Sequence, residues 1–468
     1  MRQTEGKADS EVREDDIHMM NNDIKHLYEL FLHSEGANTD TRTIRPGEMF
    51  FALKGENFDG NEYAMKALEA GAAYAIVSSD SETSALASED SRIIPVENTL
   101  TALKNLARIH RNSMAPGGKR LTVIGLTGTN GKTTTKELIK AVLEKKFNVT
   151  ATQGNLNNEI GVPLSLLQIT RATQIAVIEM GASHPGDIKS LVSVSMPDYG
   201  LITNVGKGHL LGFGSYDGVR KTKGELYDYI HETGGSIFLN EDLPYLQEMA
   251  SERNIEKIIP YGVAYDGVKL LPPSPDTPFL KMDIPVSCSR SCTLETHLVG
   301  NYNAANVMAA LAVGRYFGVP VEDAVDAISC YMPSNNRSQL MKTERNTLII
   351  DAYNANPVSM EAALSNLEAT PAENKAVMLG DMLELGPDSA AEHDKVVRTV
   401  CGMHIKEAFF VGREFGAALS RCGDPERCRH FNSSDLLAAY LKKNRLSGHT
   451  VLIKGSRGIR MEKAVPEL

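Results

Sequence analysis

The sequence predicts an α/β protein of three domains, two of which are open parallel sheets with helices on both faces. Short apolar runs of strand length alternate with segments of helical periodicity along most of the 468 residues, the pattern of strand–helix units in parallel sheets. A chain of this length is typical of about three domains. Apolar residues make up 42% of the chain and charged residues 23%, an ordinary globular composition.

The first segment, residues 22–109, is predicted to be a small α/β domain. Apolar runs at 49–53 and 74–77 predict strands, and residues 64–70 have a helical pattern between them. A connector rich in proline, glycine and basic residues, 114–120, separates this domain from the next.

The second segment, residues 110–333, opens with a buried-strand run at 121–126, a glycine-rich turn and a helical pattern over 136–147. The stretch 271–278 contains four prolines and is predicted to be a loop or an edge connection. Further strands are predicted at 175–178, 200–202 and 236–239. The strand–helix alternation predicts a mostly parallel sheet.

The third segment, residues 334–468, is again predicted to be a parallel sheet with helices between its strands. Ligands of such open sheets bind beyond the carboxyl ends of the strands, so functional residues are expected there. The predicted strands are 347–350, 376–379, 407–411 and 451–453.

Composition excludes several classes of protein. The 49 basic and 59 acidic residues give a net charge of −10, which argues against a general nucleic-acid binder. No apolar run is long enough to span a membrane. Residues 1–21 are polar and charged, and they predict a loose tail, not a signal peptide. Six cysteines without a CxxC spacing form no disulfide framework. We expect a reduced, cytoplasmic protein and a monomer.

The strongest functional signal is the segment GLTGTNGKTTT at residues 125–135, between a strand and a helix. Its glycines allow backbone N–H groups to approach a phosphate, Lys132 supplies a cation, and Thr133 supplies a hydroxyl oxygen for Mg²⁺. Leu126 stands where the usual P-loop has glycine, so the loop is a variant. The alternative is a tight turn with a surface lysine. The predicted nucleotide-binding residues are Gly128, Thr129, Asn130, Gly131, Lys132, Thr133 and Thr134.

This variant loop resembles the ATP loop of the Mur ligase family, which makes the peptide of the bacterial cell wall. The resemblance extends from about residue 24 to about residue 462. It implies a three-domain, ATP-dependent amide ligase that uses Mg²⁺ and proceeds through an acyl phosphate. Other segments that resemble family motifs are 154–164, 178–181, 203–209 and 303–306, with Arg337 and Asp351 at the positions of an Arg and an Asp in the family's last domain.

Three motifs are similar to the branch of the family that adds D-alanyl-D-alanine to UDP-N-acetylmuramoyl tripeptide. They are 351–357, 380–386 and 454–457. Branches that add single amino acids usually carry a histidine where this chain has Asn354 and Asn356. The alternatives are such a sibling ligase, a folylpolyglutamate-synthase-like ligase, or a P-loop ATPase that acts as a conformational switch.

The resemblance implies several roles in the chemistry. Glu179 ends an apolar strand, and its carboxylate is expected at Mg²⁺. His209 is expected to be a second Mg²⁺ ligand, although Mg²⁺ prefers oxygen donors. With Thr133 these are the predicted metal ligands. Asn157 and Asn158 are expected to bond the acyl phosphate or a sugar hydroxyl. The alternative for Glu179 is a helix cap or a solvated charge, for His209 a surface histidine, and for Asn157 and Asn158 a turn.

The remaining expected contacts bind the substrates. Asn303 and Asn306, one helical turn apart, are expected at the adenine edge, although Asn303 also suits a helix N-cap. Arg337 is suited to phosphate and Asp351 to a ribose hydroxyl. Asp40, Thr41 and Arg42 are expected at the UDP end, and Asn354, Asn356, Ser359, Lys454 and Arg457 at the dipeptide end.

Lys223 follows His209 by 14 residues, the spacing at which several Mur ligases place a carbamylated lysine. A carbamate would supply anionic oxygen to a hard cation. Its formation requires a neutral amine, and hence a lowered pKa of Lys223. The alternative is a helix-surface lysine that pairs with Glu225 or Asp228.

Overall fold

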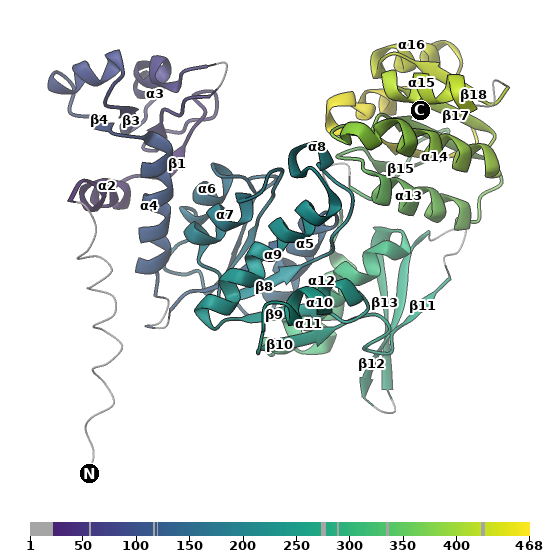
Figure 1. The fold of residues 1–468 in the computed structure, drawn as a ribbon, viewed down its shortest axis with the longest axis horizontal. Helices are drawn as coiled ribbons and strands as arrows, with labels where there is room; N and C mark the ends of the chain where they lie inside the picture. The colour runs from purple at the N-terminus through teal and green to yellow at the C-terminus, as the bar shows by residue number, and fades with distance from the viewer. Residues whose placement is uncertain are drawn as a thin grey trace. The chain divides into compact units, whose positions relative to one another are not determined.

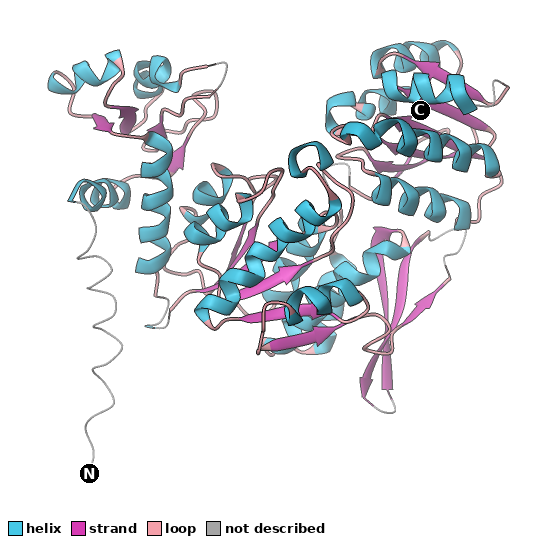
Figure 2. Ribbon diagram, viewed as in Figure 1, coloured by secondary structure: helices cyan, strands magenta, loops and turns pink. Residues whose placement is uncertain are grey.

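The computed structural model describes residues 22–55, 58–115, 118, 120–272, 278–287, 290–333, 337–422 and 426–468 (Figure 1). Within these ranges the strands form four sheets, most of them flanked by helices (Figure 2). The expected α/β class is confirmed. The predicted tail lies outside the described residues, as do part of the connector 114–120 and most of the proline-rich stretch 271–278.

The described chain separates into two compact units. The first runs to Gly125 and includes Phe147–Gly181 and Asp187–Tyr199, and the second comprises Leu126–Lys146, Ala182–Gly186 and Gly200–Leu468. The domain boundaries expected from the sequence, at 109/110 and 333/334, stay a prediction.

The N-terminal sheet has the order β1-β2-β3-β4, and all its neighbouring strands are parallel. Its core contains Phe50, Ala75 and Val77 of the strands and Ala64 and Leu68 of α3. The predicted strands and helix of this segment are confirmed. Its elements are α2 (Asn22–Leu32), β1 (Ala37–Asn38), β2 (Met49–Phe51), η1 (Gly60–Tyr63), α3 (Ala64–Glu69), β3 (Tyr74–Ser78), η2 (Glu82–Ser88), β4 (Ile93–Val96) and α4 (Thr99–Ser113).

The central sheet has the order β10-β9-β8-β5-β7-β6. Every residue of β7 is buried, as expected for a strand covered on both faces. The predicted strands are confirmed, while β6 and β10 were not predicted. The elements are β5 (Thr122–Thr127), α5 (Lys132–Leu143), β6 (Val149–Ala151), α6 (Gly161–Leu166), β7 (Ile175–Glu179), α7 (Asp187–Ser195), β8 (Tyr199–Ile202), α8 (Leu210–Phe213), α9 (Tyr216–Thr233), β9 (Ser236–Asn240), α10 (Pro244–Ser251) and β10 (Ile258–Tyr261).

A small antiparallel sheet, with the order β11-β12-β13, follows the central strands. Its strands flank the stretch that the prolines marked as a loop, and they were not predicted. The elements of this part are β11 (Lys269–Leu271), β12 (Phe279–Ser287), β13 (Arg290–Val299), η4 (Asn301–Asn303), α11 (Ala304–Tyr316) and α12 (Val321–Cys330).

The C-terminal sheet has the order β14-β15-β19-β16-β17-β18, in which β14 is antiparallel to β15 and the other pairs are parallel. All four predicted strands are confirmed. The elements are β14 (Gln339–Lys342), β15 (Thr347–Asp351), α13 (Pro357–Ala369), β16 (Lys375–Gly380), η5 (Gly386–Asp388), α14 (Ser389–Gly402), β17 (Glu407–Val411), α15 (Arg413–Cys422), β18 (Cys428–Phe431), α16 (Ser434–Lys443), β19 (Thr450–Lys454), η6 (Arg457–Ile459) and η7 (Met461–Glu467).

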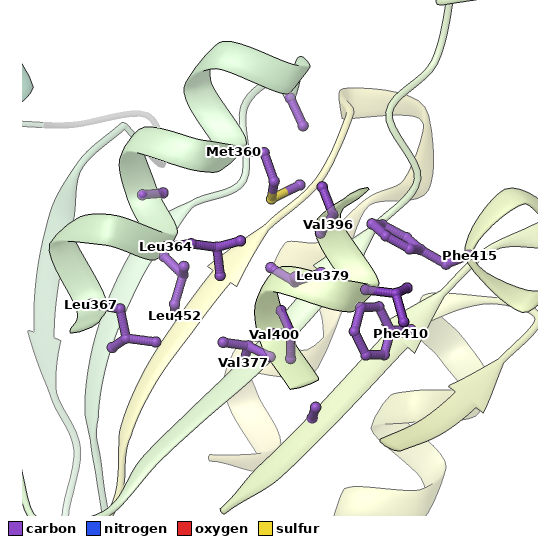
Figure 3. Close-up of a cluster of buried hydrophobic side chains, with 14 of the residues drawn as sticks. Met360, Leu364, Leu367, Val377, Leu379, Val396, Val400, Phe410, Phe415 and Leu452 are labelled. Atoms are coloured by element: carbon purple, nitrogen blue, oxygen red, sulfur yellow. The ribbon is translucent and has the colours of Figure 1, made fainter. Parts of the chain in front are cut away.

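This sheet has a hydrophobic core on each face. Figure 3 shows the core in which side chains of α13, α14 and α15 pack against the strands. Val377 and Leu379 of β16 belong to this core, whereas Ala376 and Met378 belong to the core that α16 covers. Because successive side chains of a strand point to opposite faces, the helices cover the sheet on both sides and leave its strand ends for function.

Candidate active site

The predicted phosphate loop lies between β5 and α5. Gly128 has φ +149° and Gly131 has φ +78°, conformations that favour glycine. A Cβ at Gly128 would lie 1.9 Å from the hydroxyl oxygen of Thr203, and one at Gly131 would lie 2.5 Å from Asn306 Oδ1. Both glycines are therefore required by the backbone and by the close approach of neighbouring side chains.

The loop is held by the segment that follows β8. The side-chain amide of Asn204 accepts from Asn130 N at 2.9 Å and donates to Asn130 O at 3.0 Å. Thr203 Oγ1 donates to the same carbonyl at 2.7 Å, and Thr129 N donates to Asn204 O at 3.0 Å. Two motifs about 75 residues apart in the sequence thus form one rigid structure.

Lys132 lies at the start of α5 and bends back over the loop. Its ammonium donates to the carbonyls of Gly128 at 2.8 Å and Thr129 at 3.1 Å. The next residue, Thr133, is buried at the helix N-terminus. A helix N-terminus with a nearby cation favours a bound phosphate.

Asn303 and Asn306 are buried against α5. Thr135 Oγ1 donates to Asn306 Oδ1 at 3.0 Å, and Asn306 Nδ2 donates to Asn303 Oδ1 at 3.0 Å. Asn303 occupies the N-cap position of α11, yet its side chain makes no capping bond and donates instead to Val299 O at 2.9 Å. In this conformation Asn306 is bonded to α5, and Asn303 holds the Asn306 amide.

His209 and Lys223 are gathered near Lys132. His209 precedes α8, and Lys223, in α9, is only 2% exposed with its ammonium 5.7 Å from the centroid of the Phe213 ring. The His209 ring packs edge-on against the same ring. Desolvation, together with the positive charges of Lys132 and Lys223, lowers the pKa of His209, while Glu384 opposes this shift.

The alternative reading of Lys223 as a lysine on the helix surface does not match its burial, because only 2% of the residue is exposed. The two acidic residues considered as its partners also bond elsewhere: Glu225 accepts from Gly186 N at 2.8 Å, and Asp228 accepts from Arg253 Nε at 2.7 Å. Lys223 is therefore a buried amine.

Glu179 is the last residue of β7 and is almost fully buried. Its carboxylate accepts from Asn157 Nδ2 at 2.8 Å, and its backbone N–H donates to Thr152 Oγ1 at 3.0 Å. Asn158 accepts from Gly161 N at 2.8 Å at the start of α6, so its oxygen serves the turn. Asn157 is thus bonded directly to the expected metal ligand.

A polar cluster lies at the carboxyl ends of β15 and β19. Asp351 and Lys454 are paired residues of these neighbouring strands, and the Lys454 ammonium donates to the Asp351 carboxylate. It also donates to Asn354 O at 3.2 Å. Ser338 N donates to the other Asp351 oxygen at 3.4 Å. The two residues predicted to contact different substrates are therefore an ion pair.

Tyr353 was not singled out by the sequence, although it lies inside one of the motifs. The guanidinium carbon of Arg337 lies 3.6 Å from the centroid of its ring, and that of Arg457 lies 5.3 Å away. Arg457 also donates to the Tyr353 hydroxyl at 3.2 Å. Arginine stacks well on aromatic faces. The sequence could have indicated Tyr353, because it is an aromatic residue inside a motif that contains predicted substrate contacts.

Asn356 and Ser359 begin α13 with a capping box, in which each side chain accepts from the other's backbone N–H at 2.9 and 3.1 Å. The Asn356 amide also exchanges hydrogen bonds with that of Asn130, at 2.7 and 3.3 Å. Within the second compact unit, the phosphate loop and α13 are therefore joined. Asn354 accepts from its neighbour Ala355 N at 2.9 Å.

The predicted UDP-end residues lie after β1 in the first compact unit. The Arg42 guanidinium contacts the Asp40 carboxylate at 2.6 Å. The hydrogen bonds from Arg42 lower the pKa of Asp40 to about 2. Arg42 is exposed and Asp40 partly exposed, with Thr41 between them, so both charges reach the surface of this domain.

Clusters of metal-binding side chains and membrane-spanning helices are both absent from the described ranges. These ranges contain no cluster of three or more His, Cys, Asp or Glu side chains that could hold a metal ion. Mg²⁺ commonly takes only one or two protein ligands and completes its shell with phosphates and water. The hydroxyl of Thr133 and the carboxylate of Glu179, each buried at the end of an element, fit that chemistry. No helix in the same ranges is long and apolar enough to cross a membrane.

A glycine-rich loop between a strand and a helix of a parallel sheet defines a phosphate-binding α/β protein. Models of the Mur ligase family match the chain in three places: the catalytic domain model at residues 33–111, the middle domain model at 126–314 and the glutamate ligase domain model at 336–457. The chain belongs to the Mur ligase family.

Individual relatives are similar over nearly their whole length. The UDP-N-acetylmuramoyl-tripeptide–D-alanyl-D-alanine ligase of Bacillus subtilis is 35% identical, covering 92% of this chain and 93% of that protein. A crystal structure of MurF from Acinetobacter baumannii superimposes with a TM-score of 0.81 at 27% identity, over 95% of this chain and 98% of that one. The crystal structure of the MurF ligase of Thermotoga maritima in complex with ADP superimposes with a TM-score of 0.78 at 25% identity, over 96% of this chain and 98% of that one.

Proposed function

We propose that this protein is an ATP-dependent ligase that joins D-alanyl-D-alanine to UDP-N-acetylmuramoyl tripeptide. The products are ADP, phosphate and the UDP-muramoyl pentapeptide of peptidoglycan synthesis. The observation that carries the proposal is the 35% identity to the Bacillus subtilis ligase over 92% of the chain. The likeness to a MurF structure that contains ADP supports ATP as the second substrate.

The reaction joins a carboxylate to an amine through an acyl phosphate. The terminal phosphoryl group of ATP passes to the tripeptide carboxylate, and the dipeptide amine then attacks the carbonyl carbon and expels phosphate. The protein contributes positioning and charge neutralisation. The backbone N–H groups of residues 128–131 and the N-terminus of α5, with Thr134, would bind the phosphates, and Lys132 would neutralise their charge.

Mg²⁺ is proposed as the metal cofactor, with Thr133, Glu179 and His209 as its protein ligands. When bound, it would neutralise charge on the phosphate oxygens. Asn157 holds one oxygen of the Glu179 carboxylate, which fixes the direction of that ligand. Lys223, which is buried near His209, is proposed to carry the carbamate.

The other contacts are proposed from the expected roles. Arg337 and Asp351 would bind the nucleotide, and Asn303 and Asn306 would meet the adenine edge. Asn306 also accepts from Thr135 of α5 and lies against Gly131, and Asn303 accepts from Asn306. Asp40, Thr41 and Arg42 would bind the UDP end, and Asn354, Asn356, Ser359, Lys454 and Arg457 the dipeptide end. A cytoplasmic location, where ATP is available, and a monomeric state complete the proposal.

The deciding experiment measures phosphate release from ATP by the purified protein. We expect release only when UDP-muramoyl tripeptide and D-alanyl-D-alanine are both present. Single amino acids replace the dipeptide in a parallel series, which tests the sibling ligases, and folate replaces the nucleotide substrate in another. Release that is unchanged by either substrate would overturn ligation and favour an ATPase switch.

A further inference from the structure

The loop between β16 and η5 contacts the segment that carries His209. Glu384, in this loop, accepts a hydrogen bond from His209 Nδ1 through its carboxylate. Its backbone carbonyl accepts from Leu211 N at 3.2 Å. Both His209 (φ +52°) and Glu384 (φ +65°) have left-handed backbone conformations. Such conformations are uncommon outside glycine and persist where the surroundings impose them, so the contact is made by two constrained residues.

The loop that presents Glu384 is itself fixed. Met382 N donates to Nε2 of the fully buried His393 at 3.0 Å. Leu383 N donates to Ser456 Oγ at 2.9 Å. The backbone on the N-terminal side of Glu384 is therefore tied at two consecutive residues, which limits where the Glu384 carboxylate can lie.

The contact determines the state of the His209 ring. A carboxylate can only accept a hydrogen bond, so Nδ1 carries the proton. In a neutral imidazole the lone pair is then on Nε2. Metal-bound histidines commonly donate their other ring N–H to a carboxylate, which fixes the tautomer and the ring orientation.

We propose that Glu384 is a positioning residue of the ligase, which orients the His209 imidazole and keeps Nε2 as its lone-pair donor for the metal. The proposal rests on the proposed function, in which His209 is a metal ligand. Glu384 lies 175 residues after His209, in the loop that follows β16 of the C-terminal sheet. The His209 ring is therefore oriented for the metal only when the loop after β16 contacts it.

A second ion pair between the same segments supplies the matched control. Lys207 Nζ, two residues before His209, contacts the Glu392 carboxylate of α14 at 2.8 Å. Glu392→Gln removes a charge from this docking contact without touching the imidazole. If Glu384 acted only through docking of the two segments, Glu392→Gln would weaken metal binding as much as Glu384→Ala.

The first measurement is the ¹⁵N spectrum of the histidine rings in the metal-free protein above pH 8, with the His209 signals assigned by their loss in His209→Gln. We expect the Nδ1–H tautomer in the wild type and in Glu392→Gln, and a shift to Nε2–H in Glu384→Ala. Glu384→Gln should retain the wild-type tautomer, because its amide oxygen can still accept. An unchanged tautomer in Glu384→Ala would overturn the proposal.

The second measurement is the affinity for Mn²⁺ in the presence of ATP, monitored by electron paramagnetic resonance. Glu384→Ala should weaken it by about 10- to 100-fold, and Glu392→Gln by less than about 3-fold. Equal losses in both variants, or a tautomer shift without weaker binding, would contradict the proposal. If His209→Gln binds Mn²⁺ normally, the proposed ligand role of His209 fails. If His209→Gln weakens binding and Glu384→Ala does not, the proposal alone fails.

Discussion

Lys132 tests the phosphate loop at the scale of one residue. Its ammonium donates hydrogen bonds to the carbonyls of Gly128 and Thr129, and a bound triphosphate would offer anionic oxygens in their place. We expect Lys132→Ala to lose at least about 100-fold in turnover, because one preorganised charge contact is worth roughly 3 kcal/mol. Phosphate release at saturating substrates measures the loss.

The control for this variant lies on the same helix. Lys140 pairs with Glu144 at 3.6 Å on the helix surface, so Lys140→Ala should keep near-normal turnover. If Lys132→Ala matched that control, the loop lysine would be structural and the nucleotide site would lie elsewhere.

Lys223 allows a direct chemical test of the carbamate. Because the amine is buried, we expect ¹³C-labelled bicarbonate to yield a carbamate resonance in the wild type. Lys223→Ala should lose the resonance and most activity, and a short-chain carboxylic acid in solution should restore part of that activity. Lys221, exposed and paired with Asp217 at 2.9 Å on the same helix, provides the control: Lys221→Ala should retain both. A wild type without the resonance, with full activity in Lys223→Ala, would refute both roles.

Tyr353 separates stacking from hydrogen bonding. Tyr353→Phe loses only the hydroxyl that Arg457 contacts, and its kcat/KM for ATP should change by less than about 3-fold. Tyr353→Ala removes the ring on which Arg337 and Arg457 lie. With each stacking contact worth about 0.5–1 kcal/mol, we expect a loss of about 10-fold. Equal losses in both variants would mean that the ring does not position the arginines.

At the scale of elements, α4 carries a pH-sensitive contribution to stability. His110, buried in this helix, donates from Nε2 to Ile169 O at 2.7 Å, while Nδ1 is buried without a hydrogen-bond partner among the described residues. Burial lowers the pKa of His110 below its ordinary 6.5. Above pH 6.5 the ring is neutral in both the folded and the unfolded state. Below pH 6.5 the unfolded state binds the proton first, so the free energy of unfolding falls.

The expected slope is at most about 1.4 kcal/mol per pH unit from this residue. Urea denaturation at pH 7.5 and 5.5 measures it as the difference between the wild type and His110→Gln, in which nothing titrates at this position. The wild type should lose more stability on acidification than the variant. Equal losses would mean that His110 is protonated in the folded protein as readily as in the unfolded chain.

The regular elements of the fold were predictable where burial is complete. Strands such as β7, β16 and β17 are continuous apolar runs, since both faces are covered. The strands β6, β10 and β18 have only three or four residues and are partly exposed, and β10 contains Pro260, so their sequences do not mark them as strands. The antiparallel sheet β11–β13 was not predicted, because its first connection is rich in proline and many of its strand residues are exposed.

The candidate site was predictable where a motif is local and not where partners are distant. The phosphate loop is a contiguous pattern whose glycines and lysine have direct physical reasons. By contrast, the contact of His209 with Glu384 joins positions 175 residues apart, and nothing in either segment alone indicates it. The pairing of Asp351 with Lys454 likewise follows from strand order, which the sequence does not reveal.

At the scale of the whole molecule, we expect ligands to change the arrangement of the domains. Residues predicted for one active site, such as Lys132 and Asp351, belong to the central and C-terminal domains predicted from the sequence, and interdomain clefts commonly close on binding. Small-angle scattering should show a smaller radius of gyration with a non-hydrolysable ATP analogue and the nucleotide substrate together. The dipeptide alone should leave the radius unchanged. The same radius in all states would contradict closure.

The position of β19 has a consequence for how the protein is made. This strand is the last of the C-terminal sheet in the sequence, yet it lies between β15 and β16 and pairs with both. During synthesis the earlier strands emerge first, and the edges of β15 and β16 that pair with β19 are still without that partner. Unpaired strand edges are prone to aggregate, so the nascent domain exposes such edges until β19 has paired with its two neighbours. A ribosome that stalls shortly before residue 450 would hold two half-sheets instead of one.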